Sequence, residues 1–293
     1  MVKHKFRPKT KENLKALCDN ENIYLGDIDT SKITDMSNLF SFTNRTDFSG
    51  IETWDTSHVT DMSEMFYAAE SFNEDISCWN TSNVKNMRAM FQFAFSFDQP
   101  IGNWDVSKVE TMECMFTGAK RFNQSIGNWN VSNVKNMNGM FCGAKEFNQD
   151  ISKWNVSNVY AMSGMFTDAT KFNQPINQWD VSNVEYMGFM FSSAESFNQP
   201  LNNWNVLKAN IMEYMFSDAK AFNQDIGKWD VSNVKDMDWM FVNAKSFKQV
   251  LPKEWAEKAG YENPVKTKNN VKVNLKGKFT KKQNSVKTDD MEI

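Results

Sequence analysis

The hydrophobic residues of this chain recur with a period of 25 residues over most of its length. Tryptophan marks the period, because it stands at eight equally spaced places: Trp54, Trp79, Trp104, Trp129, Trp154, Trp179, Trp204 and Trp229. When this Trp is numbered position 0 of the repeat, Met fills positions 8 and 11, Phe fills positions 12 and 18, and Ala fills position 15 in all eight copies. A fixed period of this length predicts successive stacked units, which are called coils below.

The spacing within one period predicts the elements of a coil. Positions 8, 11, 12 and 15 follow the i, i+3, i+4, i+7 rule, which predicts a short helix that buries two Met, one Phe and one Ala. Trp at position 0 and the Val that is usual at position 2 flank a polar residue, as in a strand with one buried face. We therefore expect an α/β solenoid, a right-handed stack of about nine coils that each contain a short parallel strand, a turn and a short helix.

The ends of the array predict caps. Before the first coil, "KENLKAL" predicts a short helix with Thr10 as its N-cap, and its Leu14 and Leu17 would cover the open edge of the stack. After the last coil the next Trp is delayed by one place, to Trp255, within a second predicted helix. The chain is thus divided into an N-terminal helical cap, the solenoid, a C-terminal capping helix and a Lys-rich tail, at residues 1–27, 28–251, 252–260 and 261–293.

The repeat also resembles that of a known family. The consensus WDVSNVxxMxxMFxxAxxFNQxI, seen in Trp104–Ile126 and its copies, is similar to the 25-residue repeat of the BspA-like leucine-rich-repeat surface proteins of mycoplasmas, spirochaetes and other bacteria. The resemblance covers residues 28–251. It implies a leucine-rich-repeat-like solenoid that is exposed on the cell surface and acts in adhesion or protein binding, without catalysis.

Charge is distributed unevenly, although the net charge is only −3. Residues 1–20 and residues 261–293 each carry a net charge of +4, whereas the residues between them carry −11. Phosphate binding needs positive charge gathered on the folded surface, so this acidic body argues against a nucleic-acid-binding array. No apolar run is long enough to predict a membrane span.

Two signals about the compartment point in opposite directions. The start, MVKHKFRPKTKENLKAL, contains no apolar stretch and no small-residue cleavage site, so it predicts no secretory signal. Of the four Cys, Cys78, Cys114 and Cys142 differ in repeat position, so none is expected to stack on another, and free thiols favour a reducing, cytoplasmic compartment. The family resemblance implies the cell surface or secretion instead, and the compartment stays open.

Regular ladders along the repeat have both structural and ligand-binding interpretations. The Met rows could bind Cu(I), but their spacing with Phe and Ala favours core packing. Position 1 mixes Asp and Asn, which favours a structural turn over a calcium-binding ladder, because a calcium site would keep its carboxylates. The Asn-Gln pair that is usual at positions 19 and 20 has two interpretations. It could form a polar surface that recognises a ligand. We favour the other interpretation, in which these side chains form hydrogen bonds with backbone groups at a corner of each coil. We expect no metal and no cofactor.

Candidate catalytic residues are scarce. The chain contains only His4 and His58, and no acid or Cys is matched to either on a face that the sequence predicts. Gly-rich phosphate loops and the CxxC and HExxH motifs are absent from the sequence. We therefore expect that the protein is not an enzyme.

Position 10 is the most informative variable position. On a helix it would lie about 200° around the axis from position 8 and point away from the core. In the last three coils it holds Phe189, Tyr214 and Trp239, with Tyr186 nearby, and a run of exposed aromatic residues is typical of a binding surface. The alternative is that the C-terminal segment folds back over these rings. Two other residues could form a smaller patch, Phe93 and Phe95.

These observations predict a non-enzymatic repeat scaffold that mediates protein–protein interaction or adhesion through exposed faces of the solenoid. Its partner would be another protein, from a host or a second copy of the chain. One alternative is a structural module that assembles with copies of itself. A metal-binding or ice-lattice-binding solenoid is a further alternative with less support.

Overall fold

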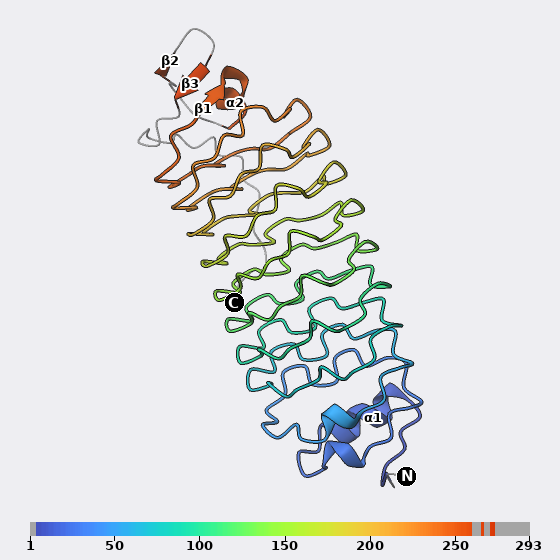
Figure 1. Cartoon of the computed structure of the whole chain (residues 1–293). Coiled ribbons are helices and arrows are strands. Elements are labelled where there is room, and N and C mark those ends of the chain that lie inside the picture. The colour runs from blue at the N-terminus through green and yellow to red at the C-terminus, as the bar shows by residue number, and fades with distance from the viewer. Residues whose placement is uncertain (1–3, 260–264, 267–269, 273–293) are drawn as a thin grey trace, which may run out of the picture.

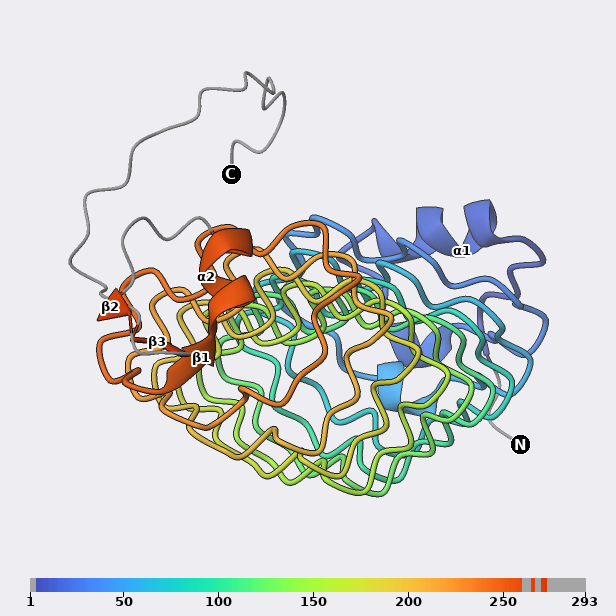
Figure 2. The same ribbon diagram turned by 90° about the horizontal axis from the view of Figure 1, so that it is seen from above.

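The computed structural model describes residues 4–259, 265–266 and 270–272. Its chain winds through successive coils that stack along one axis, with the N-terminal helix at one end and a small sheet at the other (Figure 1). Seen from above, the coils overlap as elongated loops (Figure 2). Parallel backbone bridges join each coil to the next at position 7, at Asp35, Asp61, Asn86, Thr111, Asn136, Ala161, Tyr186, Ile211 and Asp236. The 25-residue period of the sequence is therefore the step of the stack.

Regular helices and strands occur only near the two ends of the described chain. The N-terminal end contains helix α1 (Lys11–Cys18) and the 3₁₀ helices η1 (Leu25–Asp27) and η2 (Ile51–Thr53). The C-terminal end contains β1 (Val250–Pro252), α2 (Lys253–Lys258), β2 (Val265–Lys266) and β3 (Asn270–Lys272). These three strands form an antiparallel sheet in the order β1-β3-β2, so two short strands lie within the segment predicted as a tail. The rest of that segment lies outside the described residues.

The prediction of a short helix in each coil was wrong. In the Trp54 coil, Glu64 at position 10 and Ala68 at position 14 have φ angles of 56° and 52°, and every other Trp coil also has positive φ at these two positions. A left-handed residue interrupts a right-handed helix. The N–H groups at alternate positions also bond outside their own coil, as Glu64 N–H donates to Arg88 O at 2.8 Å. The segment is therefore a series of tight turns hydrogen-bonded to the next coil.

The predicted strand at positions 0 and 2 is also absent, although the burial pattern behind it is present. Trp154 is 3% exposed and Val156 is 1% exposed, while Asn155 between them is exposed. Parallel pairing between coils occurs at position 7 as isolated bridges rather than as a continuous strand. Alternating burial therefore identified the inward-facing residues but not the backbone conformation.

The core consists of aromatic and Met rows that run through the whole stack. Trp129 and Trp154 lie with ring centroids 6.4 Å apart and an interplanar angle of 4°. The position 12 rings of neighbouring coils also stack, at 5.8 Å between Phe141 and Phe166. The indole N–H of each Trp at position 0 donates to a backbone carbonyl oxygen, as Trp154 Nε1 does to Ile126 O at 3.1 Å. Every Met at positions 8 and 11 is fully buried, which confirms that the Met rows pack the core.

The N-terminal end of the stack is closed by α1 and by one buried cation. Thr10 caps α1 as predicted, with its hydroxyl accepting a hydrogen bond from Asn13 N–H, and Leu14 is fully buried. Arg45 is 2% exposed and its guanidinium donates to four backbone carbonyl oxygens. These acceptors belong to the end of α1, the segment after it and the first coil: Cys18, Asn20, Ile23 and Asp47.

The C-terminal end is closed in a similar way by α2. Trp255 is 1% exposed and its ring lies 6.3 Å from that of Trp229, so it continues the Trp row although it arrives one residue late. Lys258 at the end of α2 donates to the carbonyl oxygens of the last coil, at Val231, Ser232 and Val234. Across the residues that the structure describes, no helix combines the length and the apolar character that crossing a bilayer requires.

Candidate functional site

The position 10 aromatic residues of the last three coils form a stack on the surface. The rings of Phe189 and Tyr214 lie 4.9 Å apart at an angle of 9°, and those of Tyr214 and Trp239 lie 6.3 Å apart at 11°. Phe189 is 39% exposed, whereas Tyr214 and Trp239 are half-buried. The alternative in which the C-terminal segment covers these rings concerns residues that are mostly outside those described. The predicted stripe is thus brought together, although by turns rather than by a helix.

The backbone conformation at position 10 makes these aromatic residues unusual. Phe189, Tyr214 and Trp239 have φ angles of 59°, 52° and 62°, in the left-handed region. The same position of two central coils holds Gly139 and Gly164, at φ 60° and 62°. A side chain in this region costs about 1–2 kcal/mol relative to its ordinary conformation, and glycine avoids that cost. The left-handed conformation is shared by position 10 of every Trp coil, as at Glu64 and Ala89. The stripe is therefore distinguished by three successive large aromatic side chains at this position and not by the conformation itself.

Two exposed tyrosines lie at positions 6 and 7 of neighbouring coils. Tyr186, at position 7 of the Phe189 coil, is 41% exposed, and its nearness to the stripe stays a prediction. Tyr160, at position 6 of the preceding coil, is 44% exposed and its ring lies 6.5 Å from that of Tyr186. Sequence reasoning missed Tyr160, because positions 6 and 7 come together only across the coil-to-coil bridge. The sequence did contain a signal, because the two tyrosines occupy adjacent repeat positions in successive coils.

Acidic residues of the next coil are hydrogen-bonded through their backbone to residues of the stripe. Phe189 N–H donates to Glu213 O at 2.8 Å and Tyr214 N–H donates to Asp238 O at 2.9 Å, so an acid of one coil follows each ring of the coil before. Within the described part of the chain, Glu213, Asp236 and Asp238 form no ion pair. The C-terminal face is defined here by the aromatic and acidic residues together: Tyr186, Phe189, Glu213, Tyr214, Asp236, Asp238 and Trp239.

The pKa values of these acids reflect burial and mutual repulsion. Burial raises the pKa of the Glu213 carboxyl, and the charges of Asp236 and Asp238 raise it further. Burial also raises the pKa of Asp238, with Asp236 contributing in the same direction. The pKa of the Tyr214 hydroxyl is raised by burial and by these three acids. The C-terminal face therefore holds negative charge that the described chain leaves without a neutralising cation.

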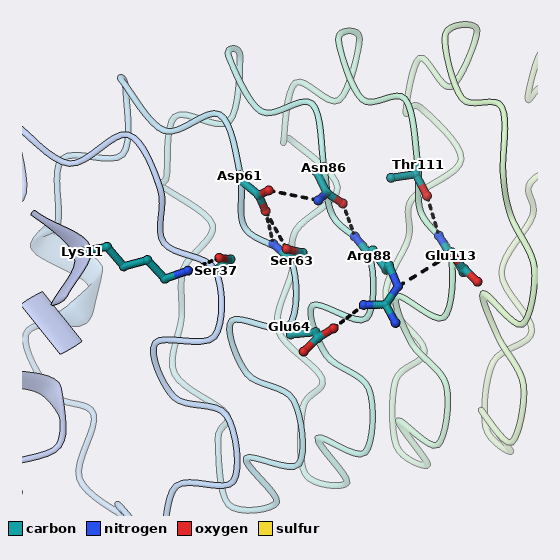
Figure 3. A network of polar contacts seen from close by, with 9 residues as sticks. All are labelled: Lys11, Ser37, Asp61, Ser63, Glu64, Asn86, Arg88, Thr111 and Glu113. Carbon is teal, nitrogen blue, oxygen red and sulfur yellow. Dashed lines mark hydrogen bonds and ion pairs between the residues drawn. The ribbon is translucent and has the colours of Figure 1, made fainter. Parts of the chain in front are cut away.

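Acids at positions 6, 9 and 10 of the N-terminal half are paired with cations of neighbouring coils. There Arg88 lies between two acids, bonded to Glu64 and 3.7 Å from Glu113, which Figure 3 shows. One coil further on, Lys135 pairs with Glu110 at 2.9 Å. These pairs join positions 6, 9 and 10 of successive coils, so the geometry of the stack permits neutralisation. Within the described residues, the acids of the C-terminal face have no such cation partner because of the residues present there, and not because of the fold.

A pH-dependent stability prediction follows from Glu213. The Glu213 carboxyl has a higher pKa in the folded chain than in the unfolded chain, where the value is about 4.3. The folded chain therefore binds the proton more strongly. As the pH rises through these two pKa values, ionisation of Glu213 lowers the stability of the fold. We expect Glu213→Gln to raise the melting temperature at neutral pH and to leave it nearly unchanged below pH about 4. Calorimetry at the two pH values measures this difference.

Asp105→Asn is the matched control for that prediction. Hydrogen bonds from Ser107 lower the pKa of Asp105, so its ionised form stabilises the fold and this contribution is lost only as the pH falls through its folded value. The Asp105→Asn variant should therefore show no rise in melting temperature at neutral pH. An equal rise in both variants would show that overall charge, rather than the surroundings of Glu213, causes the effect.

The second predicted patch is present in part. Phe93 and Phe95 lie with ring centroids 6.3 Å apart, and both are half-buried. Lys120 Nζ lies 4.0 Å from the centroid of the Phe95 ring. Sequence reasoning missed two members of this row, Tyr67, whose ring is 5.8 Å from Phe93, and Phe42, which is 72% exposed. Aromatic residues at position 13 or 14 of three successive coils were the available signal.

The polar ladders have structural partners. At position 1, Asp105 accepts a hydrogen bond from Ser107 N–H at 3.0 Å, and Asn130 accepts the equivalent bond from Ser132. At position 19, Asn148 N–H donates to Asn123 Oδ1 at 3.0 Å. The position 20 amide makes similar bonds, such as Gln174 Nε2 to Asn148 O at 2.9 Å. Both ladders satisfy backbone groups at corners of the coils, which confirms the structural interpretation.

His58 has closer neighbours than the sequence indicated. Ser57 Oγ lies 3.0 Å from His58 Nδ1 and 2.6 Å from Asp55 Oδ1, so a hydroxyl, an imidazole and a carboxylate meet in one exposed turn. The expectation that no acid accompanies His58 was therefore wrong. The contact between the hydroxyl and the position 1 side chain recurs in other coils without any His, as between Ser132 and Asn130, which assigns it to the turn.

The four cysteines are free thiols. Burial raises the pKa of Cys18 to about 12 and that of Cys142 to about 11, so both are poor nucleophiles at neutral pH. Cys114 and Cys142, from neighbouring coils, both lie close to Gly139, so they approach one another although they differ in repeat position. Among the described residues, no three His, Cys, Asp or Glu side chains are grouped so that they could share a metal ion.

Comparison with known proteins adds one result. Four overlapping segments match the family described as Mycoplasma protein of unknown function, DUF285, at residues 10–126, 93–197, 115–223 and 176–274. No curated protein and no solved structure gives a significant match. The four segments overlap along the repeat array and together extend over most of the chain. The chain therefore belongs to the DUF285 repeat family.

Proposed function

We propose that this protein is a non-enzymatic repeat scaffold that binds another protein through its C-terminal face. Membership of a repeat family supports the scaffold, because stacked repeats supply extended surfaces with little other chemistry. The observation that carries the binding role is the stack of Phe189, Tyr214 and Trp239 on backbone positions that favour glycine. The core does not require these rings, since two other coils place Gly139 and Gly164 at the same position.

The physical properties of the stripe suit protein recognition. Aromatic side chains offer a large apolar area and lose little conformational entropy on binding, which is why they are frequent at the centres of interfaces. Here the rings are also held in register, because Phe189 N–H and Tyr214 N–H bond to the next coil at 2.8 Å and 2.9 Å. A preorganised aromatic surface binds with less ordering cost than a flexible one.

The resemblance to the BspA-like proteins adds a finer proposal. It favours a right-handed, leucine-rich-repeat-like solenoid that is displayed on a cell surface and acts in adhesion. The stacked coils and the buried Trp, Met and Phe rows support a solenoid of this general kind. The surface role rests on the resemblance alone, and surface labelling of intact cells with a membrane-impermeant reagent tests it.

The binding role is tested by a triple variant, Phe189→Ala, Tyr214→Ala and Trp239→Ala. We expect it to fold normally, because Ala89 occupies position 10 at φ 53° in another coil. If the stripe is a hot spot, the variant should lose at least about 2 kcal/mol of affinity, or roughly 30-fold, for its protein partner. Quantitative capture from a cell extract by immobilised wild-type and variant chains compares the two.

Two further experiments are needed to interpret that result. Phe93→Ala with Phe95→Ala tests the smaller patch, and it should leave capture unchanged. Light scattering over a range of concentrations tests self-assembly, which predicts a mass that falls on dilution and on mutation of Trp239. Equal capture by the wild type and by a correctly folded triple variant would remove the C-terminal face as a binding site.

A further inference from the structure

We propose that the C-terminal face binds a basic segment of a partner protein, with Lys or Arg side chains seated between the carboxylates of Glu213, Asp236 and Asp238 and the adjoining rings. This inference rests on the proposed function and names the chemistry of its partner. The negative charge of the face is complementary to a basic segment. The proposal commits to a segment of another protein, and the other possible occupants are outcomes of the test.

Acids at position 9 differ between the two ends of the stack in whether they have a cation partner. In the N-terminal half, the acids at positions 6, 9 and 10 are paired with cations of neighbouring coils, as Glu64 and Glu113 are with Arg88. At the C-terminal face, Glu213 and Asp238 occupy position 9 without an ion pair in the described chain. An incoming cation would therefore complete a pattern that the same fold completes by itself elsewhere.

The second step concerns the aromatic rings. A cation over an aromatic face is attracted by the ring quadrupole, by about 0.5–2 kcal/mol according to its desolvation. The protein contains this contact at the other patch, where Lys120 Nζ lies 4.0 Å from the Phe95 ring centroid. At the C-terminal face the Tyr214 ring stacks on Phe189 at 4.9 Å and lies within the electrostatic influence of the Glu213, Asp236 and Asp238 carboxylates. A Lys or Arg side chain can therefore contact a ring and a carboxylate together.

The third step is geometric. Ring centroids 4.9 Å and 6.3 Å apart make the stripe about as long as three or four residues of extended chain, at roughly 3.4 Å per residue. Side chains of an extended segment alternate between its two sides. A segment laid along the stack would thus present every second side chain to the face, and alternating basic residues match this spacing.

Other occupants fit less well. A symmetric contact with a second copy would bring the acids of two faces together and add repulsion. Nucleic acid would meet the same repulsion from its phosphates. A single metal ion is disfavoured because no three acidic, His or Cys side chains are suitably grouped within the described residues. The chain's own residues 261–293, with a net charge of +4, are the remaining competitor.

The test uses the full chain and defined peptide probes. A fluorescein-labelled peptide of alternating Arg and Gly is titrated with protein, and a matched peptide with Glu in place of Arg is the probe control. Fluorescence anisotropy is read at about 50 mM and about 300 mM salt, because screening weakens exposed charge contacts. We expect saturable binding of the Arg peptide, weakened by salt, and no binding of the Glu peptide.

Variants locate the site. Glu213→Gln, Asp236→Asn and Asp238→Asn together should weaken binding of the Arg peptide about 10-fold or more, which corresponds to about 1.4 kcal/mol. A control that removes the same number of charges elsewhere, Glu21→Gln with Glu70→Gln and Glu74→Gln, should change it less than about twofold. Equal weakening in both triple variants, or equal binding of the Glu peptide, would overturn the proposal.

The remaining outcomes separate this inference from the proposed function. If the aromatic triple variant loses its captured partner while the acid variant keeps both partner and peptide, the binding role stands and the basic partner is wrong. If neither variant loses the partner, both proposals fall. If the Arg peptide binds only after all Lys of residues 261–293 are changed to Gln, the chain's own segment occupies the face and the assignment to another protein is wrong.

Discussion

Trp154→Ala should lower the free energy of unfolding by about 3–5 kcal/mol, the range for large aromatic residues truncated in a core. Trp154 is 3% exposed, stacks on Trp129 and Trp179 at 6.4 Å, and bonds to Ile126 O through its indole N–H. Its ring also stacks on Phe141 at 6.2 Å. The variant therefore loses burial, three ring contacts and a buried hydrogen bond. Urea unfolding followed by circular dichroism measures the change.

The position of Trp154 within the stack adds a second expectation. Each coil is stabilised mainly by its neighbours, so a defect in a central coil divides the array into two shorter stacks. We expect a broader unfolding transition, or two transitions, in place of one cooperative step. Two controls separate the contributions of Trp154.

Trp154→Phe keeps a ring but leaves Ile126 O without its donor, which should cost about 1–3 kcal/mol. Tyr160→Ala removes an exposed ring and should stay within about 0.5 kcal/mol of the wild type. A Trp154→Ala variant as stable as Tyr160→Ala would contradict the packed Trp row.

Arg45→Met should destabilise the N-terminal end by about 3–4 kcal/mol. The substitution keeps most of the apolar stem, but it removes every donor from four carbonyl oxygens around a side chain that is 2% exposed. Hydrogen bonds from a charged donor contribute about 1.5–3 kcal/mol each, and buried acceptors left without a donor add a desolvation penalty. The loss is smaller than the sum because removing the guanidinium also relieves the cost of its burial.

Hydrogen exchange locates the effect of Arg45→Met. Exchange should speed up in α1 and in the first coil, whereas central coils such as that of Trp154 should keep their protection. Arg88→Met is the matched control, because Arg88 is an exposed Arg whose ion pairs are expected to contribute less than about 1 kcal/mol. Equal losses in the two Arg variants would show that the buried carbonyl cluster does not hold the cap.

The sequence allowed the inward-facing residues to be identified but not the backbone that carries them. Positions 8, 11, 12 and 15 are all buried, as the helical pattern predicted, yet they lie on turns. A turn that closes every three residues returns side chains to one face almost as a helix does, so the spacing alone cannot separate the two. Glycine at position 10 or 14, as at Gly139 and Gly143, was the available contrary signal, because glycine disfavours a helix interior.

The candidate site was predicted in part for a related reason. Phe189, Tyr214 and Trp239 share one repeat position, so the period was enough to place them together. The acids became visible only when hydrogen bonds showed position 9 of one coil beside position 10 of the coil before, as for Glu213 and Phe189. Whether an acid is neutralised depends on contacts between coils, which the spacing within one coil does not contain.

Left-handed position 10 has a consequence for how such surfaces can change. Its backbone accepts residues from glycine to tryptophan while the Met and Phe rows beside it stay buried. A substitution at position 10 can therefore change the outer surface of one coil while the buried rows keep their contacts. If this position carries the proposed binding surface, specificity changes one coil at a time, without selection acting on the interior.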